Sequence, residues 1–207
     1  MIDNYTPSIL LTQAIAELSK LPGIGKKTAL RLVLYMLKWN ITEIEKFSNA
    51  FIQLKNNIKY CKKCYNISDT DICSICTNPK RNHKLVCIVE SIREIIAIEQ
   101  TAQYNGLYHV LGGIISPMEG IGPNNLSIDA LENRVQNEGI NEIIFALSTT
   151  MEGDTTCFYI SRKLSNYQLK FTSIARGVAF GGDLEYTDEI TLGQSIANRN
   201  EYKKEKL

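Results

Sequence analysis

The stretch LVCIVE, at residues 85–90, decides the fold of most of this chain. Its first five residues form a continuous apolar run, which is typical of a strand buried in a parallel sheet. EIIFAL, at residues 142–147, is a second run of the same kind, and residues 107–111 and 169–174 are shorter ones. Helical spacing of apolar residues covers residues 92–100, 128–137, 155–164 and 187–198. Strands that alternate with helices of this length predict βαβ units and a parallel sheet.

The residues before this part predict helices. Apolar residues recur at helical spacing over residues 8–21, 26–38 and 42–60. Ser8 is the expected N-cap of the first helix, and Thr42 with Glu45 three residues later forms a capping-box pattern for the third. The first two helices are separated by LPGIG, a tight turn in which Pro22 fixes its own φ and the glycines allow positive φ.

Four cysteines interrupt the polar segment between these two parts, residues 60–84. They form two pairs, Cys61 with Cys64 and Cys73 with Cys76, and eight residues separate the pairs. Each pair can present two thiolates from one tight turn, and four thiolates complete a tetrahedral shell around Zn²⁺ at about 2.3 Å. The segment has too few large apolar residues for a core, so a structural zinc would supply its folding energy. Two disulfides, a redox CxxC pair and an iron–sulfur centre remain alternatives.

The LPGIG turn is also a candidate anion site. Gly23 and Gly25 let the backbone curl so that several N–H groups point outward at a helix N-terminus, where a DNA phosphate would fit. Lys26 and Lys27 add positive charge without discriminating between bases. Binding through this turn would be independent of sequence and sensitive to salt. The alternative is that the turn only joins two packed helices.

Charge divides the chain into two parts. Residues 1–84 hold 13 Lys and Arg against 6 Asp and Glu, a net +7, and residues 85–207 hold 10 against 16, a net −6. This asymmetry predicts modules that face different partners: nucleic acid for the basic part, and a metal or a basic protein surface for the acidic part. The alternative is that both charged surfaces are only solvated.

Composition excludes several classes of protein. The 207 residues are 44% hydrophobic and 22% charged, as in ordinary globular proteins. There is no run of about 20 apolar residues that could span a membrane, and residues 1–21 do not have the pattern of a secretory signal. Six cysteines are too few for a disulfide scaffold, so a reduced, cytoplasmic setting is expected. Cys87 and Cys157, outside the cluster, are interpreted as small buried hydrophobic residues.

Acidic residues follow two of the predicted strands. Glu90 ends the first strand, and Glu152 and Asp154 follow the strand at residues 142–147. Sites in open α/β sheets form at the carboxyl ends of the strands, so these three carboxylates could hold Mg²⁺ for phosphoryl-transfer chemistry. Alternatively, Glu90 is only solvated, and the other two are acids favoured at a helix N-terminus. No nucleophile or general acid stands out beside them, and His83 and His109 are assigned no role.

The order of these parts resembles the bacterial RecR recombination-mediator family over nearly the whole chain. The resemblance rests on LPGIGKKTA at residues 21–29, the four cysteines, YHVLGGIISPMEGIGPNNL at residues 108–126 and ARGVAFGGDLEYTDEITL at residues 175–192. Three details depart from the family pattern. Residues 148–150 replace an Asn-Pro-Thr run, Asp154 stands where Glu is frequent, and Ala179-Phe180 replaces Pro-Val.

The resemblance implies an α+β chain of several parts. These are a helix–hairpin–helix region at residues 1–59, a four-cysteine zinc knuckle at residues 60–84, an α/β Toprim domain with a parallel sheet at residues 85–174 and a C-terminal helical segment at residues 175–207. Glu90, Glu152 and Asp154 coincide with the acidic signature of the Toprim fold, which this family is regarded as using for contacts with RecO and DNA, not for catalysis.

The function implied by the resemblance is DNA repair in the RecFOR pathway. Such a protein would displace single-strand-binding protein at gaps and help load the RecA recombinase, with RecO and RecF as partners. It would assemble as a homo-oligomer, a dimer or a tetrameric ring, in the bacterial cytoplasm near the nucleoid. Two rival hypotheses are a Mg²⁺-dependent Toprim enzyme, such as a nuclease, primase or topoisomerase, and an RNA- or ribosome-associated zinc protein.

Overall fold

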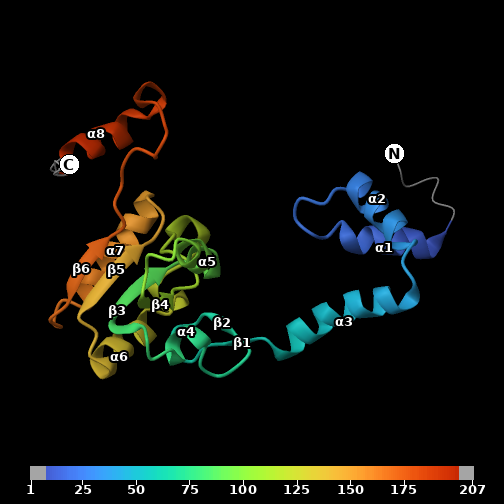
Figure 1. Cartoon of the computed structure of the whole chain (residues 1–207), viewed down its shortest axis with the longest axis horizontal. Helices are drawn as coiled ribbons and strands as arrows, with labels where there is room; N and C mark the ends of the chain where they lie inside the picture. Colours follow the sequence, from blue (N-terminus) through green and yellow to red (C-terminus); the bar gives the residue numbers. More distant parts are fainter. Residues whose placement is uncertain (1–7, 201–207) are drawn as a thin grey trace, which may run out of the picture. The chain divides into compact units, whose positions relative to one another are not determined.

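The computed structural model of the chain describes residues 8–200 and divides into two compact units. The first unit runs to Ile58, and the second begins at Lys59. The ends of the sequence-based ranges 1–59 and 175–207, and part of the segment considered as a signal, lie outside the described residues. Each unit is described here by itself (Figure 1).

Helices build the first unit. They are α1 (Ile9–Leu18), α2 (Lys26–Met36) and α3 (Ile41–Asn57). The Oγ of Ser8 accepts a hydrogen bond from the backbone N–H of Leu11 at 3.4 Å, which confirms the predicted N-cap. The small core between α1 and α2 contains Ile15, Ala29 and Val33, which lie on the apolar stripes of the two helices.

The capping box predicted for the third helix was wrong by two residues. The helix begins at Ile41, and Asn40 is its N-cap. The Asn40 side chain accepts from the Glu43 N–H at 3.0 Å, and the Glu43 carboxylate accepts from the Asn40 N–H at 2.9 Å. Asn is as good an N-cap as Thr, and both pairs have the three-residue spacing, so the sequence pattern alone could not separate them.

The second unit contains a short hairpin and a four-stranded sheet. Its strands are β1 (Lys59–Tyr60), β2 (Ile67–Ser68), β3 (Asn82–Val89), β4 (Gly106–Val110), β5 (Glu142–Ala146) and β6 (Lys170–Ser173). Its helices are α4 (Ser74–Thr77), α5 (Ile92–Gln100), α6 (Ile128–Glu138), α7 (Met151–Lys163) and α8 (Glu189–Ala197), with 3₁₀ turns η1 (Pro117–Glu119), η2 (Pro123–Asn125) and η3 (Leu184–Tyr186). The sheet order is β4-β3-β5-β6 and every pairing is parallel, which confirms the predicted parallel sheet.

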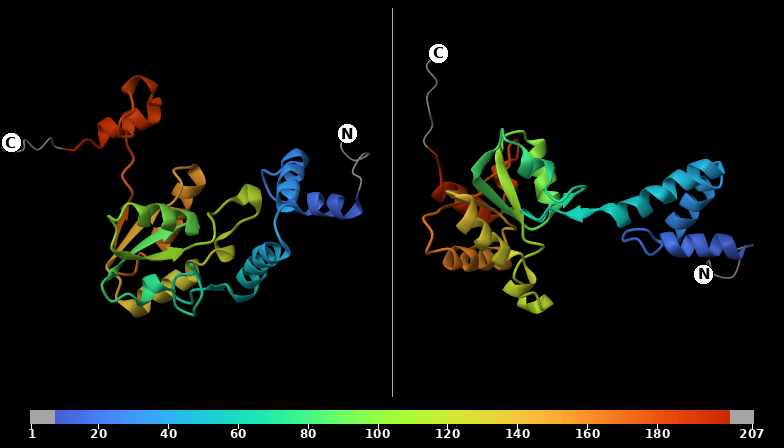
Figure 2. Two further views of the ribbon diagram at one scale, coloured as in Figure 1. Left: turned by 45° about the vertical axis from the view of Figure 1, so that its right-hand side comes forward. Right: turned by 90° about the horizontal axis from the view of Figure 1, so that it is seen from below.

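Alternate residues of the strands face opposite sides of the sheet. Val86 and Ile88 of β3 pack into a large core with residues of α6 and α7, and Cys87 and Val89 pack into a smaller one with Ile95 of α5. The sheet therefore lies between α5 on one side and α6 and α7 on the other (Figures 1 and 2). Both faces are covered, which explains why the apolar runs of β3 and β5 are continuous.

Two element boundaries differ from the sequence prediction and affect the candidate site. β3 begins at Asn82 instead of residue 85. α7 begins at Met151, four residues earlier than predicted, because the Thr150 side chain accepts from the Gly153 N–H at 3.2 Å and caps the helix. Glu152 and Asp154 consequently lie in the first turn of α7. Between residues 8 and 200, no helix combines the length and apolar character needed to cross a bilayer.

Candidate metal centre and nucleic-acid interface

The four predicted cysteine ligands come together in one buried cluster. The Sγ atoms of Cys61, Cys64, Cys73 and Cys76 all lie within 4.8 Å of one another, and all four residues are buried. Four sulfurs around a zinc at about 2.3 Å would be about 3.8 Å apart, so the cluster fits one tetrahedral zinc. The Cys64 and Cys73 sulfurs are 3.6 Å apart and all six cysteines are free, which excludes the disulfide alternative.

The backbone around the first pair explains how two thiolates point at one centre. β1 and β2 pair antiparallel, and the turn between them contains Cys61 and Cys64. Tyr65 adopts a left-handed φ of 62°, and its N–H donates to the Cys61 carbonyl at 2.9 Å. The N–H of Cys73 donates to the Cys61 sulfur at 3.3 Å, which joins the two pairs. This tight turn points both sulfurs of the first pair toward the second pair.

The thiol groups need a cation if all are to ionise. Hydrogen bonds from Cys64 and then Cys76 lower the pKa of Cys73 to about 2. The hydrogen bonds to Cys73 and then Cys76, followed by burial, raise the pKa of Cys64. Cys73 is therefore favoured as a thiolate, and Cys64 is disfavoured as one. A divalent cation would replace those protons and stabilise all four sulfurs as thiolates.

The predicted anion site has an open helix N-terminus. Gly23 has a φ of 80°, which a residue with a side chain would adopt only with strain. Gly25 is the N-cap of α2 and offers no side chain to its first-turn N–H groups. That turn contains no acidic residue, and the side chains of Lys26 and Lys27 are exposed. Helix dipole and lysine charges therefore both favour an anion at this end of α2.

The basic surface extends further along α2 than the sequence reasoning recognised. Lys27, Arg31 and Lys38 line one exposed groove of about 360 Å³ together with Leu34 and Tyr35. Lys27 and Arg31 lie four residues apart on one face of α2, and Lys38 lies in the turn after the helix. The four-residue spacing of Lys27 and Arg31 is visible in the sequence, but it does not by itself distinguish a binding surface from a solvated helix face.

Two of the three predicted Toprim carboxylates make separate contacts. Glu90, at the end of β3, accepts a hydrogen bond on Oε1 from the Ser148 N–H at 2.6 Å. Asp154 is paired with Arg176, whose Nη2 lies 2.5 Å from Oδ1, and the hydrogen bond from Arg176 lowers the pKa of Asp154. Glu152 is half-buried in the first turn of α7. Among residues 8–200, the only cluster of three or more possible metal ligands is the cysteine cluster. Magnesium binding stays a prediction.

Gly153 is a site residue that the sequence reasoning missed. A Cβ at this position would lie 2.0 Å from the Ser148 carbonyl oxygen, so only glycine lets α7 approach the end of β5 this closely. The approach holds Glu152 and Asp154 beside the segment that binds Glu90. The sequence pattern did not single out this glycine, because it placed the start of α7 four residues too late.

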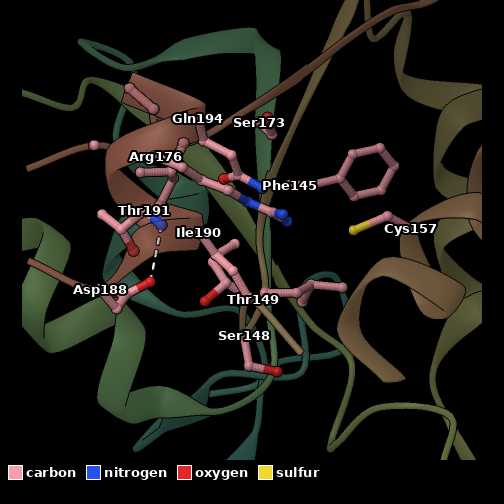
Figure 3. A pocket seen from close by; sticks show the side chains of 14 residues that line it. Phe145, Ser148, Thr149, Cys157, Ser173, Arg176, Asp188, Ile190, Thr191 and Gln194 are labelled. Atoms are coloured by element: carbon pink, nitrogen blue, oxygen red, sulfur yellow. Dashed lines mark hydrogen bonds between the residues drawn. The ribbon is translucent and has the colours of Figure 1, made fainter. Parts of the chain in front are cut away.

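A cavity of about 630 Å³ lies beside these residues, between the ends of β5 and β6 and helix α8. Figure 3 shows the Arg176 side chain extending into it, with Ser148 and Thr149 at its border. Cys157 lines the same cavity and is half-buried, with burial raising its pKa to about 11, whereas Cys87 is fully buried in the sheet. The interpretation as a buried hydrophobic residue therefore holds fully for Cys87 and only in part for Cys157.

Comparison with known families and proteins gives a consistent result. Family models match in order: RecR helix-hairpin-helix at residues 11–54, the RecR four-cysteine zinc finger domain at 58–78, Toprim domain at 84–175 and RecR C-terminal at 177–200. The chain is similar to proteins called recombination protein RecR. It is 59% identical to that of Bacteroides fragilis over 201 residues, covering 97% of this chain and 98% of the relative. It is 60% identical to the relative from Amoebophilus asiaticus over 195 residues, which cover 94% of this chain and 97% of the relative. It is 54% identical to the relative from Porphyromonas gingivalis over 202 residues, which cover 98% of this chain and 97% of the relative.

Proposed function

Because the chain belongs to the RecR family of recombination proteins, we propose that it is a DNA-binding mediator of recombinational repair. It acts at single-strand gaps, where it assists loading of the RecA recombinase together with RecO and RecF. It works in the cytoplasm near the nucleoid. It performs no bond-breaking or bond-forming chemistry itself.

The observation that carries this proposal is the N-terminus of α2. Its N-cap, Gly25, has no side chain to cap the helix, and Lys26 and Lys27 place positive charge in the first turn. Lys27, Arg31 and Lys38 continue the charge along one groove. The negatively charged phosphate backbone of DNA matches this arrangement. Phosphate contacts are independent of base sequence, so binding here requires no side chain that recognises a base.

The acidic residues support a role without catalysis. Two of the three Toprim carboxylates already have partners. Glu90 accepts a hydrogen bond from the Ser148 N–H, and Asp154 forms an ion pair with Arg176. These contacts stabilise the carboxyl end of the sheet. The same surface, which also includes the exposed Met151 of α7, is the one that we propose for contact with RecO or DNA.

Apolar side chains on the first unit support a homo-oligomer. A groove of about 550 Å³ on this unit is lined by apolar residues of all three helices. Leu37 and Ile41 at its border are 70% and 71% exposed, and Phe51 of α3 is also exposed. A second copy of the chain would remove this surface from water, and a dimer or a tetrameric ring would satisfy it.

The test uses the full-length protein with gapped and blunt DNA, in the presence and absence of Mg²⁺. We expect salt-sensitive binding to the gapped DNA, faster RecA loading when RecO is added, and no change in oligonucleotide length. Cleavage or extension of the DNA by the purified protein, lost in Glu90→Gln, would replace the mediator by a Toprim enzyme. A preference for RNA over DNA in competition would favour the RNA-associated alternative.

A further inference from the structure

Arg134 of α6 is an arginine held inside the protein at the junction between the cysteine cluster and the sheet. Its side chain is only 3% exposed. Nη1 donates to the Tyr108 carbonyl of β4 at 2.6 Å, and Nε donates to Glu138 Oε2 at 2.9 Å. Nη2 is buried and has no hydrogen-bond partner among the described residues. A buried guanidinium with one unpaired nitrogen is costly unless a further negative charge lies nearby.

The first cysteine pair of the zinc knuckle, in the turn between β1 and β2, is joined to the sheet at the same place. The Cys64 carbonyl accepts from the Val110 N–H at 2.8 Å. The ring of Tyr65 makes an edge contact with His109, with centroids 5.7 Å apart. Lys63, between the two cysteines, pairs with Glu138 at 3.2 Å. Glu138 therefore binds both the knuckle and Arg134.

The net negative charge at this junction would be larger without Arg134. Four thiolates around one zinc ion carry a net charge of roughly −2, which is placed in a buried environment. Lys63 and Arg134 are the cations bound to the junction, and Glu138 cancels one of them.

We propose that Arg134 is the buried counter-cation of the zinc–thiolate cluster and the positioning residue that ties the cluster to β4 and α6. The charge of a residue in the α/β domain then contributes to the stability of the zinc knuckle. Arg134 binds no metal itself; it stabilises the ionised sulfurs through its charge. Outer partners of this kind typically change metal affinity by about 10–100-fold.

The test is the rate at which the full-length zinc protein transfers its metal to a chromogenic chelator. Arg134→Gln removes the charge and keeps the approximate shape, and we expect release to be about tenfold faster or more. Arg134→Lys should restore most of the parental rate. Glu138→Gln removes the opposing negative charge, so release should be slower. In Co²⁺-substituted protein, Arg134→Gln should also shift the thiolate-to-cobalt charge-transfer band.

A matched control separates charge from packing. Val135→Ala removes a buried side chain from the neighbouring position of α6 without changing charge, so it should lower the melting temperature and leave zinc release unchanged. Equal release from Arg134→Gln and the parent, or equally accelerated release from Arg134→Gln, Glu138→Gln and Val135→Ala, would overturn the proposal. If Arg134→Gln does not fold, Glu138→Gln decides: slower release supports the proposal, and unchanged or faster release overturns it.

Discussion

The backbone N–H of Ser148 donates a hydrogen bond to Glu90 Oε1 at 2.6 Å. The two residues are 58 positions apart, and the contact joins the end of β3 to the segment that follows β5. A hydrogen bond to an ionised carboxylate is stronger than a neutral one, so Glu90 stabilises the carboxyl edge of the sheet. This gives the acidic residue a structural role that requires no metal.

Removal of Glu90 should therefore reduce stability. Glu90→Ala leaves the Ser148 N–H without its carboxylate partner, and the free energy of unfolding should fall by about 1–3 kcal/mol. Glu90→Gln keeps an acceptor oxygen and should lose less. Urea unfolding measures both, with Glu119→Ala, an exposed residue of η1, as the control that should change little. Unaltered stability of Glu90→Ala would show that this hydrogen bond contributes nothing.

Gly153 should not tolerate a side chain. The methyl group of Gly153→Ala would meet the Ser148 carbonyl oxygen at 2.0 Å, so α7 must shift away from β5. Forcing a group into a packed site costs about 1–3 kcal/mol, which thermal unfolding would detect. Gly193→Ala on α8, where a Cβ meets nothing within 4 Å, is the control and should be neutral or slightly stabilising. A Gly153→Ala protein as stable as its parent would contradict the close packing of α7.

Buried His109 should make stability depend on pH. Burial lowers its pKa from 6.5 to about 4, and its Nε2 lies 2.9 Å from the Ser127 carbonyl. Between these two values the unfolded chain binds a proton that the folded chain does not, so stability falls as the pH falls. From pH 7 to pH 5 the loss attributable to His109 should be about 2 kcal/mol. Denaturant unfolding of the parent and His109→Gln measures it: the variant should lack this part of the slope, and parallel profiles would contradict the assignment.

Loss of zinc should affect the sheet as well as the knuckle. Metal analysis should find about one zinc per chain, and Cys64→Ser should lower that content. Because the Cys64 carbonyl accepts from the Val110 N–H, amide exchange at Val110 should accelerate together with exchange in β1 and β2. Cys157→Ser, outside the cluster, should retain the zinc. A fully folded, metal-free protein with slow exchange at these amides would refute the structural role of the cluster.

Local patterns were sufficient to locate the four strands of the parallel sheet, though not every strand boundary, and the cysteine cluster. Continuous apolar runs located β3 and β5, and the cysteine spacing predicted four ligands that do converge. Local patterns were ambiguous at helix starts, where Asn40 and Thr42 are equivalent candidates and Thr150 was not recognised as a cap. The remaining features depend on tertiary packing.

Two contacts illustrate that dependence. Asp154 pairs with Arg176, and the Arg134 guanidinium reaches the Tyr108 carbonyl of another element. No spacing rule connects residues 22 or 26 positions apart, because their approach is set by how α7, α6 and the segment after β6 pack on the sheet. The acidic residues could thus be located from the sequence, but their partners could not.

The salt dependence of DNA binding tests the central claim most directly. The affinities of the parent, Lys26→Ala/Lys27→Ala and a control, Lys46→Ala/Lys55→Ala on α3 with the same loss of charge, are measured on gapped DNA over a range of KCl concentrations. If the N-terminus of α2 binds phosphates, the slope of log K against log salt should fall by up to about two ion equivalents, at about 0.9 per phosphate, in the first variant alone. An unchanged slope in that variant, or an equal fall in the control, would contradict the account.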